Sequence, residues 1–162
     1  MEMHDDPAIE ALRARMWIPI GAALFLIALT VSALVVPQLQ LLHLLQALIY
    51  VVVVALARRN SAWGFGAGFS VAVAWNCLNL FVTHLMQAGG VEFWSFLRTG
   101  HVRRLDTMMV PLGGIGHFIL LVACLTAFLA LRTDNRKWRK FFLGGVLALA
   151  YLVLIVAIAR PR

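Results

Sequence analysis

Five uninterrupted apolar runs constrain this chain more than any other feature of its sequence. They cover residues 17–36, 38–57, 62–86, 108–131 and 141–159, each close to or above the roughly 20 residues that a helix needs to cross about 30 Å of hydrocarbon. Hydrophobic residues make up 62% of the chain and charged residues 13%, which leaves too little polar surface to cover a water-soluble core. The sequence therefore predicts an integral membrane protein.

Helices are the expected form of these runs. In lipid a helix satisfies its own backbone hydrogen bonds, whereas a barrel would need strands of alternating polar and apolar residues, which this sequence lacks. We therefore expect an all-α polytopic bundle of five transmembrane helices, a single integral membrane domain over residues 1–162. The acidic N-terminus is not typical of a cleavable signal peptide. Asp6 followed by Pro7 instead predicts a helical lead-in to the first span.

The distribution of Lys and Arg predicts the orientation. Five spans put the termini on opposite sides of the membrane, and the 14 basic residues then divide nine to five, with the larger group on the N-terminal side. The positive-inside rule places the N-terminus in the cytoplasm, and the C-terminus and the loop of residues 87–107 on the external side of the inner membrane. This topology and attraction to lipid headgroups account for the net charge of +7, so no nucleic-acid partner is expected.

The external loop combines aromatic and basic residues. Phe93, Trp94 and Phe96 lie beside Arg98, a mixture that suits an amphipathic helix in the membrane interface. We expect this helix to lie over the mouth of the bundle; the alternative is a plain surface loop. In the third run, Gly68 follows Gly64 by four residues, a spacing that predicts close packing against another helix or protomer.

Polar side chains at membrane depth are the strongest indication of a functional site, because they are costly there. In the second run, His43, Gln46 and Tyr50 follow i, i+3 and i+7 spacing and share one helical face. The fourth run carries one histidine after three nearby glycines. The third run carries a second polar stripe at helical spacing, formed by Asn76, Asn79, Thr83 and Gln87. The residues predicted to bind a ligand are His43, Gln46, Tyr50, Asn76, Asn79, Thr83 and His117.

Depth along each run brings these stripes to overlapping heights. At 1.5 Å per residue, His43 and Gln46 lie about 7 to 12 Å from the external face, Asn79 and Asn76 about 10 to 15 Å, and His117 about 14 Å. We therefore expect one pocket that opens outward and is covered by the loop segment 93–97. The alternative is that the polar groups bond only to one another and hold the helices together.

Three histidines also form a candidate metal site: His43, His84 and His117. Neutral imidazoles suit copper or iron, axial ligation of a haem b, or hydrogen bonds to a quinone headgroup. The glycines beside His117 serve close helix packing equally well. The cofactor, if one is bound, stays open between haem b and a quinone at this point.

Missing residue types narrow the function. None of the five predicted spans has Asp, Glu, Lys or Arg in its interior, which disfavours ion-coupled transport. No Gly-x-Ser-x-Gly or His-Glu-x-x-His motif occurs, so the chain is not expected to be an enzyme. The leading hypothesis is a small membrane subunit that packs in a homo-oligomer or with other membrane subunits and holds a small apolar ligand or cofactor in an external-side polar pocket. The alternatives are a redox subunit that carries b-haem or handles quinone, and an uncoupled channel or facilitator for a neutral or anionic solute.

Overall fold

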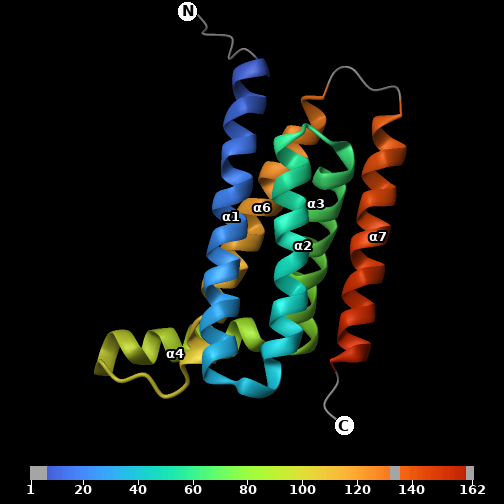
Figure 1. Ribbon diagram of the computed structural model, residues 1–162. Coiled ribbons are helices and arrows are strands. Elements are labelled where there is room, and N and C mark those ends of the chain that lie inside the picture. The colour runs from blue at the N-terminus through green and yellow to red at the C-terminus, as the bar shows by residue number, and fades with distance from the viewer. Residues whose placement is uncertain (1–6, 132–135, 160–162) are drawn as a thin grey trace, which may run out of the picture.

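Five long helices lie side by side in the computed structural model, which describes residues 7–131 and 136–159 (Figure 1). No strand occurs within those residues, and five helices are long and apolar enough to cross a membrane. The prediction of an all-α bundle with five membrane-spanning helices is therefore confirmed. The long helices are α1 (Pro7–Val35), α2 (Gln40–Arg58), α3 (Ala62–Cys77), α6 (Val110–Leu129) and α7 (Lys137–Ile158).

Four short elements connect these helices at the end of the bundle opposite the N-terminus (Figure 1). They are the 3-10 turn η1 (Pro37–Leu39), the π-helix η2 (Leu78–Val82), and the helices α4 (Leu85–Thr99) and α5 (Leu105–Met108). Helix α4 runs across the bundle and projects beyond it (Figure 1). A helix is therefore present in the loop of residues 87–107, where one was predicted, and we call this the α4 end of the bundle.

Several span boundaries differ from those read from the apolar runs. The first span begins at Leu12 and the fifth at Lys137, five and four residues before their predicted starts. The third span was predicted to reach Met86 but ends at Val82, because η2 interrupts the α-helix and His84 then adopts a left-handed conformation with φ 55°. The fourth span begins at Leu105, three residues before the first residue of its apolar run, because α5 leads directly into α6. This earlier start adds Asp106 to the span.

Glycines bring the helix backbones together over the middle and the N-terminal end of the bundle. A Cβ added to Gly21 on α1 would lie 2.7 Å from the carbonyl oxygen of Gly116 on α6, and the converse distance is also 2.7 Å. On α3, a Cβ at Gly66 would collide with the Phe141 carbonyl of α7, and one at Gly144 of α7 would collide with the Trp63 carbonyl. Close backbone approach of this kind is typical of membrane helix pairs that meet through small residues.

Gly68 also packs against neighbouring helices, as its spacing predicted. A Cβ at this position would lie 2.7 Å from Cys124 Sγ on α6 and 2.9 Å from Val53 Cγ1 on α2. Gly68 therefore contributes to the interior of one chain. Around it, large side chains fill the core without exposure to the surroundings, among them Phe65, Phe128 and Leu120.

Candidate functional site

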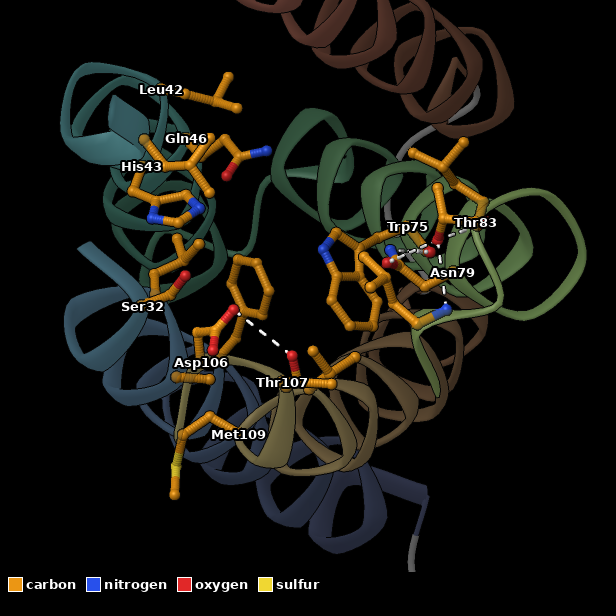
Figure 2. A pocket seen from close by; sticks show the side chains of 18 of the residues that line it. Ser32, Leu42, His43, Gln46, Trp75, Asn79, Thr83, Asp106, Thr107 and Met109 are labelled. Atoms are coloured by element: carbon orange, nitrogen blue, oxygen red, sulfur yellow. Dashed lines mark hydrogen bonds between the residues drawn. The ribbon is translucent and has the colours of Figure 1, made fainter. Parts of the chain in front are cut away.

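A cavity of about 590 Å³ lies within the α4 end of the bundle (Figure 2). All five long helices contribute to its lining, together with η1, η2, α4 and α5. Most of the wall is apolar, with Leu29 from α1, Leu42 from α2 and Val110 from α6, while Leu152 and Val156 close it along α7. The sequence predicted a pocket between the second, third and fourth spans; the cavity has lining residues from those spans, and also from α1 and α7.

Aromatic rings form the floor of this cavity. Phe25 of α1 and Trp75 of α3 line it, and both contact the His117 ring of α6. The Trp75 and His117 rings are stacked, with centroids 4.5 Å apart and an interplanar angle of 17°, while Phe25 meets His117 at 4.0 Å with its ring tilted by 62°. Sequence spacing gave no sign of these ring contacts, because each joins a different pair of helices.

His117 lies behind the floor and is fully buried. Its Nδ1 is 2.9 Å from the Gly113 carbonyl oxygen, which can only accept, so Nδ1 carries the proton and donates. Nε2 of the neutral ring then accepts from the Tyr50 hydroxyl at 2.5 Å. Both ring nitrogens are thus engaged inside the protein, and neither His117 nor Tyr50 is among the residues that line the cavity.

The polar stripe of the third span serves largely to stabilise the break in its own helix. In η2 the Thr83 amide bonds to the Leu78 carbonyl, five residues back, at 2.9 Å. Asn79 donates through Nδ2 to the Trp75 carbonyl at 2.9 Å, and Gln87 donates through Nε2 to the Leu80 carbonyl at 2.9 Å. These side chains provide donors for carbonyl groups around the interruption, where the regular i to i+4 hydrogen-bonding pattern is disturbed.

The opposite side of the cavity carries polar groups that are not used in this way. His43 and Gln46 of α2, Ser32 of α1 and Asp106 of α5 line this side, across from Trp75 and Asn79, and we call these four residues the polar wall (Figure 2). The Nδ1 atom of His43 is buried and has no hydrogen-bond partner in the part of the chain that the structure describes. A buried, unpaired imidazole nitrogen is costly, and a bound molecule that donates or accepts a hydrogen bond would remove that cost.

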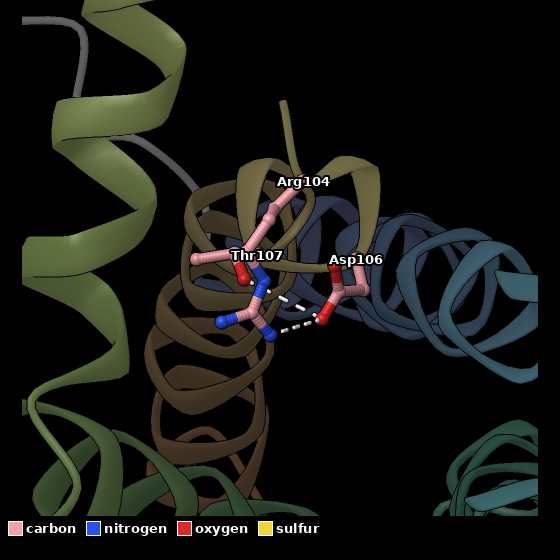
Figure 3. A network of polar contacts seen from close by, with 3 residues as sticks. All are labelled: Arg104, Asp106 and Thr107. Atoms are coloured by element: carbon pink, nitrogen blue, oxygen red, sulfur yellow. Dashed lines mark hydrogen bonds and ion pairs between the residues drawn. The ribbon is translucent and has the colours of Figure 1, made fainter. Parts of the chain in front are cut away.

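Asp106 gives the polar wall a carboxylate that the sequence interpretation left outside the spans. Arg104 Nη2 donates to Asp106 Oδ2 at 2.9 Å, and the Thr107 hydroxyl lies 3.4 Å from the same oxygen (Figure 3). The Asp106 side chain is 17% exposed and that of Arg104 66% exposed, so the pair runs from the cavity to its rim. An acidic residue just before an apolar run is typical of a helix first turn, and this signal could have extended the fourth span.

The predicted site residues therefore fall into three groups. Four of the seven predicted ligand-binding residues line the cavity: His43, Gln46, Asn79 and Thr83. Tyr50 and His117 form the hydrogen-bonded pair behind its floor, and Asn76 is absent from the lining. Ligand binding by these residues stays a prediction.

The three histidines predicted as metal ligands do not come together. Over residues 7–131 and 136–159, no three His, Cys, Asp or Glu side chains are grouped so that they could hold a metal ion. His117 is bonded through both nitrogens, and His84 is exposed at the left-handed turn before α4. The three-histidine grouping is therefore corrected, and His43 alone of the three lines the cavity.

The segment predicted to cover the pocket lies elsewhere. None of residues 93–97 lines the cavity, and from α4 only Leu85 reaches it. Helix α4 is held instead against the start of α6, where a Cβ at Gly89 would lie 2.5 Å from Pro111 Cδ. The rest of α4 projects away from the bundle (Figure 1), and its side chains Phe93 and Trp94 are exposed.

Comparisons with protein-family models, with curated proteins and with solved structures found no match to this chain. Function is therefore inferred from the chemistry of the cavity.

Proposed function

We propose that this chain is a small membrane subunit that binds one small, largely apolar molecule in the cavity at the α4 end of the bundle. The observation that carries the proposal is the polar wall, a set of hydrogen-bonding groups on one side of an otherwise apolar cavity of about 590 Å³. Small-molecule sites commonly have volumes of roughly 300 to 1,000 Å³ and combine apolar walls with a few polar groups. The cavity matches this description in both size and chemistry.

The lining also favours a particular orientation for the bound molecule. An apolar body would pack on Phe25, Trp75 and the leucine and valine side chains of α2, α6 and α7. A hydrogen-bonding head would face His43 and Gln46, and Asp106 near the rim would accept from a donor. A ligand with a ring or short chain and one polar end therefore fits best.

The two alternative functions receive less support from the same geometry. A haem held between His43 and His117 would require a free nitrogen on His117, whose ring nitrogens contact Tyr50 and Gly113. A channel would require a path past the floor, where the rings of Phe25, Trp75 and His117 contact one another and the fully buried Leu120 lies one helical turn beyond. A quinone headgroup remains compatible, because it could bond to His43 without any role for His117.

The location and assembly of the subunit belong to the same proposal. The nine-to-five division of basic residues supports an inner-membrane protein with its N-terminus in the cytoplasm and the cavity open to the external side. The exposed apolar side chains of α4, which lie beyond the bundle, support packing with a second copy or another membrane subunit. Impermeant thiol labelling of intact cells tests the orientation: Ser95→Cys should react and Arg59→Cys should not, in a Cys77→Ser/Cys124→Ala background.

Retention of a small molecule during purification tests the binding function. We expect mass spectrometry of a solvent extract, together with the absorption spectrum of the purified protein, to identify a molecule that leaves with the wild-type chain. Ser32→Trp should abolish its retention, because Ser32 lines the cavity and an indole would fill it. Leu34→Trp is the matched control, since Leu34 is 75% exposed and outside the lining.

The proposal fails if both tryptophan variants retain the same molecule in the same amount. It also fails if the wild-type chain releases nothing more than the control membrane does. A Soret band in the wild-type spectrum would support the haem alternative, and His43→Ala would then be expected to remove it.

A further inference from the structure

A second groove, outside the cavity, lies between α1 and α6 and has a polar end and an apolar end. Its volume is about 340 Å³. The lining is Arg13, Ala14 and Trp17 from α1 and Phe118, Ile119, Val122, Ala123 and Thr126 from α6. We propose that this groove binds a phospholipid with an anionic headgroup.

The order of side chains along the groove follows from the crossing of the two helices. Gly21 and Gly116 are in contact where α1 and α6 meet, and the helices run in opposite directions from there. Arg13 is eight residues from Gly21 and Thr126 ten residues from Gly116, so they lie about 12 Å and about 15 Å from the crossing at 1.5 Å per residue. Phe118, two residues from Gly116, lies only about 3 Å from it. The polar end therefore faces the N-terminal side, and the apolar end lies deeper.

This order matches a phospholipid standing in the leaflet on that side. The exposed Arg13 guanidinium and the Thr126 hydroxyl would bind headgroup phosphate, while an acyl chain would lie on Phe118, Ile119 and Val122. Trp17 is 52% exposed in the groove and suits the level between headgroups and chains. Phe118 is 64% exposed, so the apolar end is open to the surrounding lipid.

Charge complementarity decides which headgroup is favoured. Arg58 and Arg59 at the end of α2, and Lys137 and Arg139 at the start of α7, lie on the same side of the bundle as Arg13. Arg13 adds a cation directly at the groove, where an anionic lipid would gain more than a zwitterionic one. Another protein helix laid in the groove would instead cover Arg13 and would need an acidic residue opposite it.

Native mass spectrometry of the full chain in lipid nanodiscs tests this proposal. With equal amounts of phosphatidylglycerol and phosphatidylcholine present, we expect the wild-type chain to retain phosphatidylglycerol preferentially. Arg13→Ala should lower that retention about fivefold, the effect expected for one basic residue at an anionic lipid surface, and Arg13→Lys should keep most of it. Arg59→Ala removes a charge on the same side but outside the groove and should leave retention unchanged.

A second pair of variants tests the acyl chain without removing charge. Ile119→Trp should fill the groove and lower phosphatidylglycerol retention, whereas Ile115→Trp, at a 54% exposed position outside the groove, should not. Wild-type retention in both Arg13→Ala and Ile119→Trp would overturn the proposal. If Arg59→Ala lowers phosphatidylglycerol retention as much as Arg13→Ala does, the lipid is attracted by the overall charge of this side and the proposal is overturned. If Ile119→Trp breaks a dimer and leaves lipid retention unchanged, the groove is a protein interface and the proposal is overturned as well.

Discussion

At the N-terminal end of the bundle, glycines bring helix backbones into contact, whereas at the α4 end the same helices leave a cavity of about 590 Å³ between them. Gly66 and Gly144 hold α3 against α7 near the first end, where large rings such as Phe65 and Phe128 are fully buried. The groove of about 490 Å³ that remains between α2, α3 and α7 has no histidine or charged side chain in its lining. At the other end α7 contributes Leu152 and Val156 to a cavity wall. The glycines of α7 thus fix it at one end and leave room at the other.

Two histidines show the same difference at atomic scale. His117 is fully buried, and both of its ring nitrogens are hydrogen-bonded. His43 lines the cavity, and its buried Nδ1 has no partner among the described residues. A buried polar group that is satisfied contributes to stability, while an unsatisfied one reduces it and is retained where it has another use. Sequence alone treats these two residues alike, and only their surroundings separate a structural histidine from a candidate binding residue.

The largest effect should come from adding a methyl group at the closely packed end. Gly66→Ala should lower the free energy of unfolding by about 3 kcal/mol or more, because its Cβ would collide with the Phe141 backbone carbonyl, which cannot rotate away. The control is Gly90→Ala on α4, where no atom lies within 4 Å of the added Cβ. That change should be neutral or stabilising. Unfolding in mixed micelles measures the stability of both variants. Equal stability would show that α4 and the α3–α7 contact tolerate an added methyl group equally well.

A smaller loss is expected from the satisfied histidine. Tyr50→Phe keeps the ring but removes the hydroxyl that bonds to His117 Nε2, so the free energy of unfolding should fall by roughly 1 to 3 kcal/mol. Replacing His117 as well, in Tyr50→Phe/His117→Leu, should cost less than the sum of the two single changes, because the shared bond is lost only once. If the free-energy losses of the two single variants add up to the loss of the double variant, the hydrogen bond between Tyr50 and His117 does not contribute to stability.

Enlarging a side chain should distinguish the two ends directly. Val71→Phe, at a position that is 1% exposed in the buried middle of α3, should destabilise the chain by about 1 to 3 kcal/mol. Val156→Phe should change stability by less than about 0.5 kcal/mol, because Val156 lines the cavity and the ring can enter it. If both changes cost the same, the cavity is filled by side-chain rearrangement in solution.

The smallest effect on stability is expected at His43. His43→Leu removes an unpaired buried nitrogen, so the free energy of unfolding should stay within about 0.5 kcal/mol of the wild-type value or rise. The same variant should retain less of the molecule identified by extraction, if that molecule bonds to the imidazole. A loss of stability as large as that of Tyr50→Phe would indicate that His43 also has a structural partner.

The sequence predicted the spans better than the site, for a physical reason. Five apolar runs are long enough to span a bilayer whatever their tertiary contacts, and the small side chain of Gly68 indicates close packing without naming the partner. The face shared by His43 and Gln46 was also predicted, because α2 is a regular helix and its spacing holds. Local periodicity was sufficient in each of these cases.

What the sequence did not predict depended on contacts between segments or on broken periodicity. Asn79 and Thr83 both line the cavity, but they reach it through a π-helix that the apolar run does not indicate. Asp106 was placed outside the membrane because the span was counted from the first apolar residue, whereas α5 begins earlier. The pairing of His117 with Tyr50 joins residues 67 positions apart, and no pattern within either helix could indicate it.

The π-helix of the third span makes that segment tolerant of a change in chain length. Its hydrogen bond from Thr83 to Leu78 encloses one residue more than an α-helical turn does. Deleting one residue from this segment would let the wide turn close as a regular α-helical turn, and the segments before and after it would keep nearly the same relative rotation. A deletion in the regular part of α3, at Val73 for example, has no wide turn to absorb it and would rotate everything beyond it by about 100°. Among descendants of one ancestral gene, the π-helix is therefore the place in the third span where a codon can be gained or lost with the least change to the cavity.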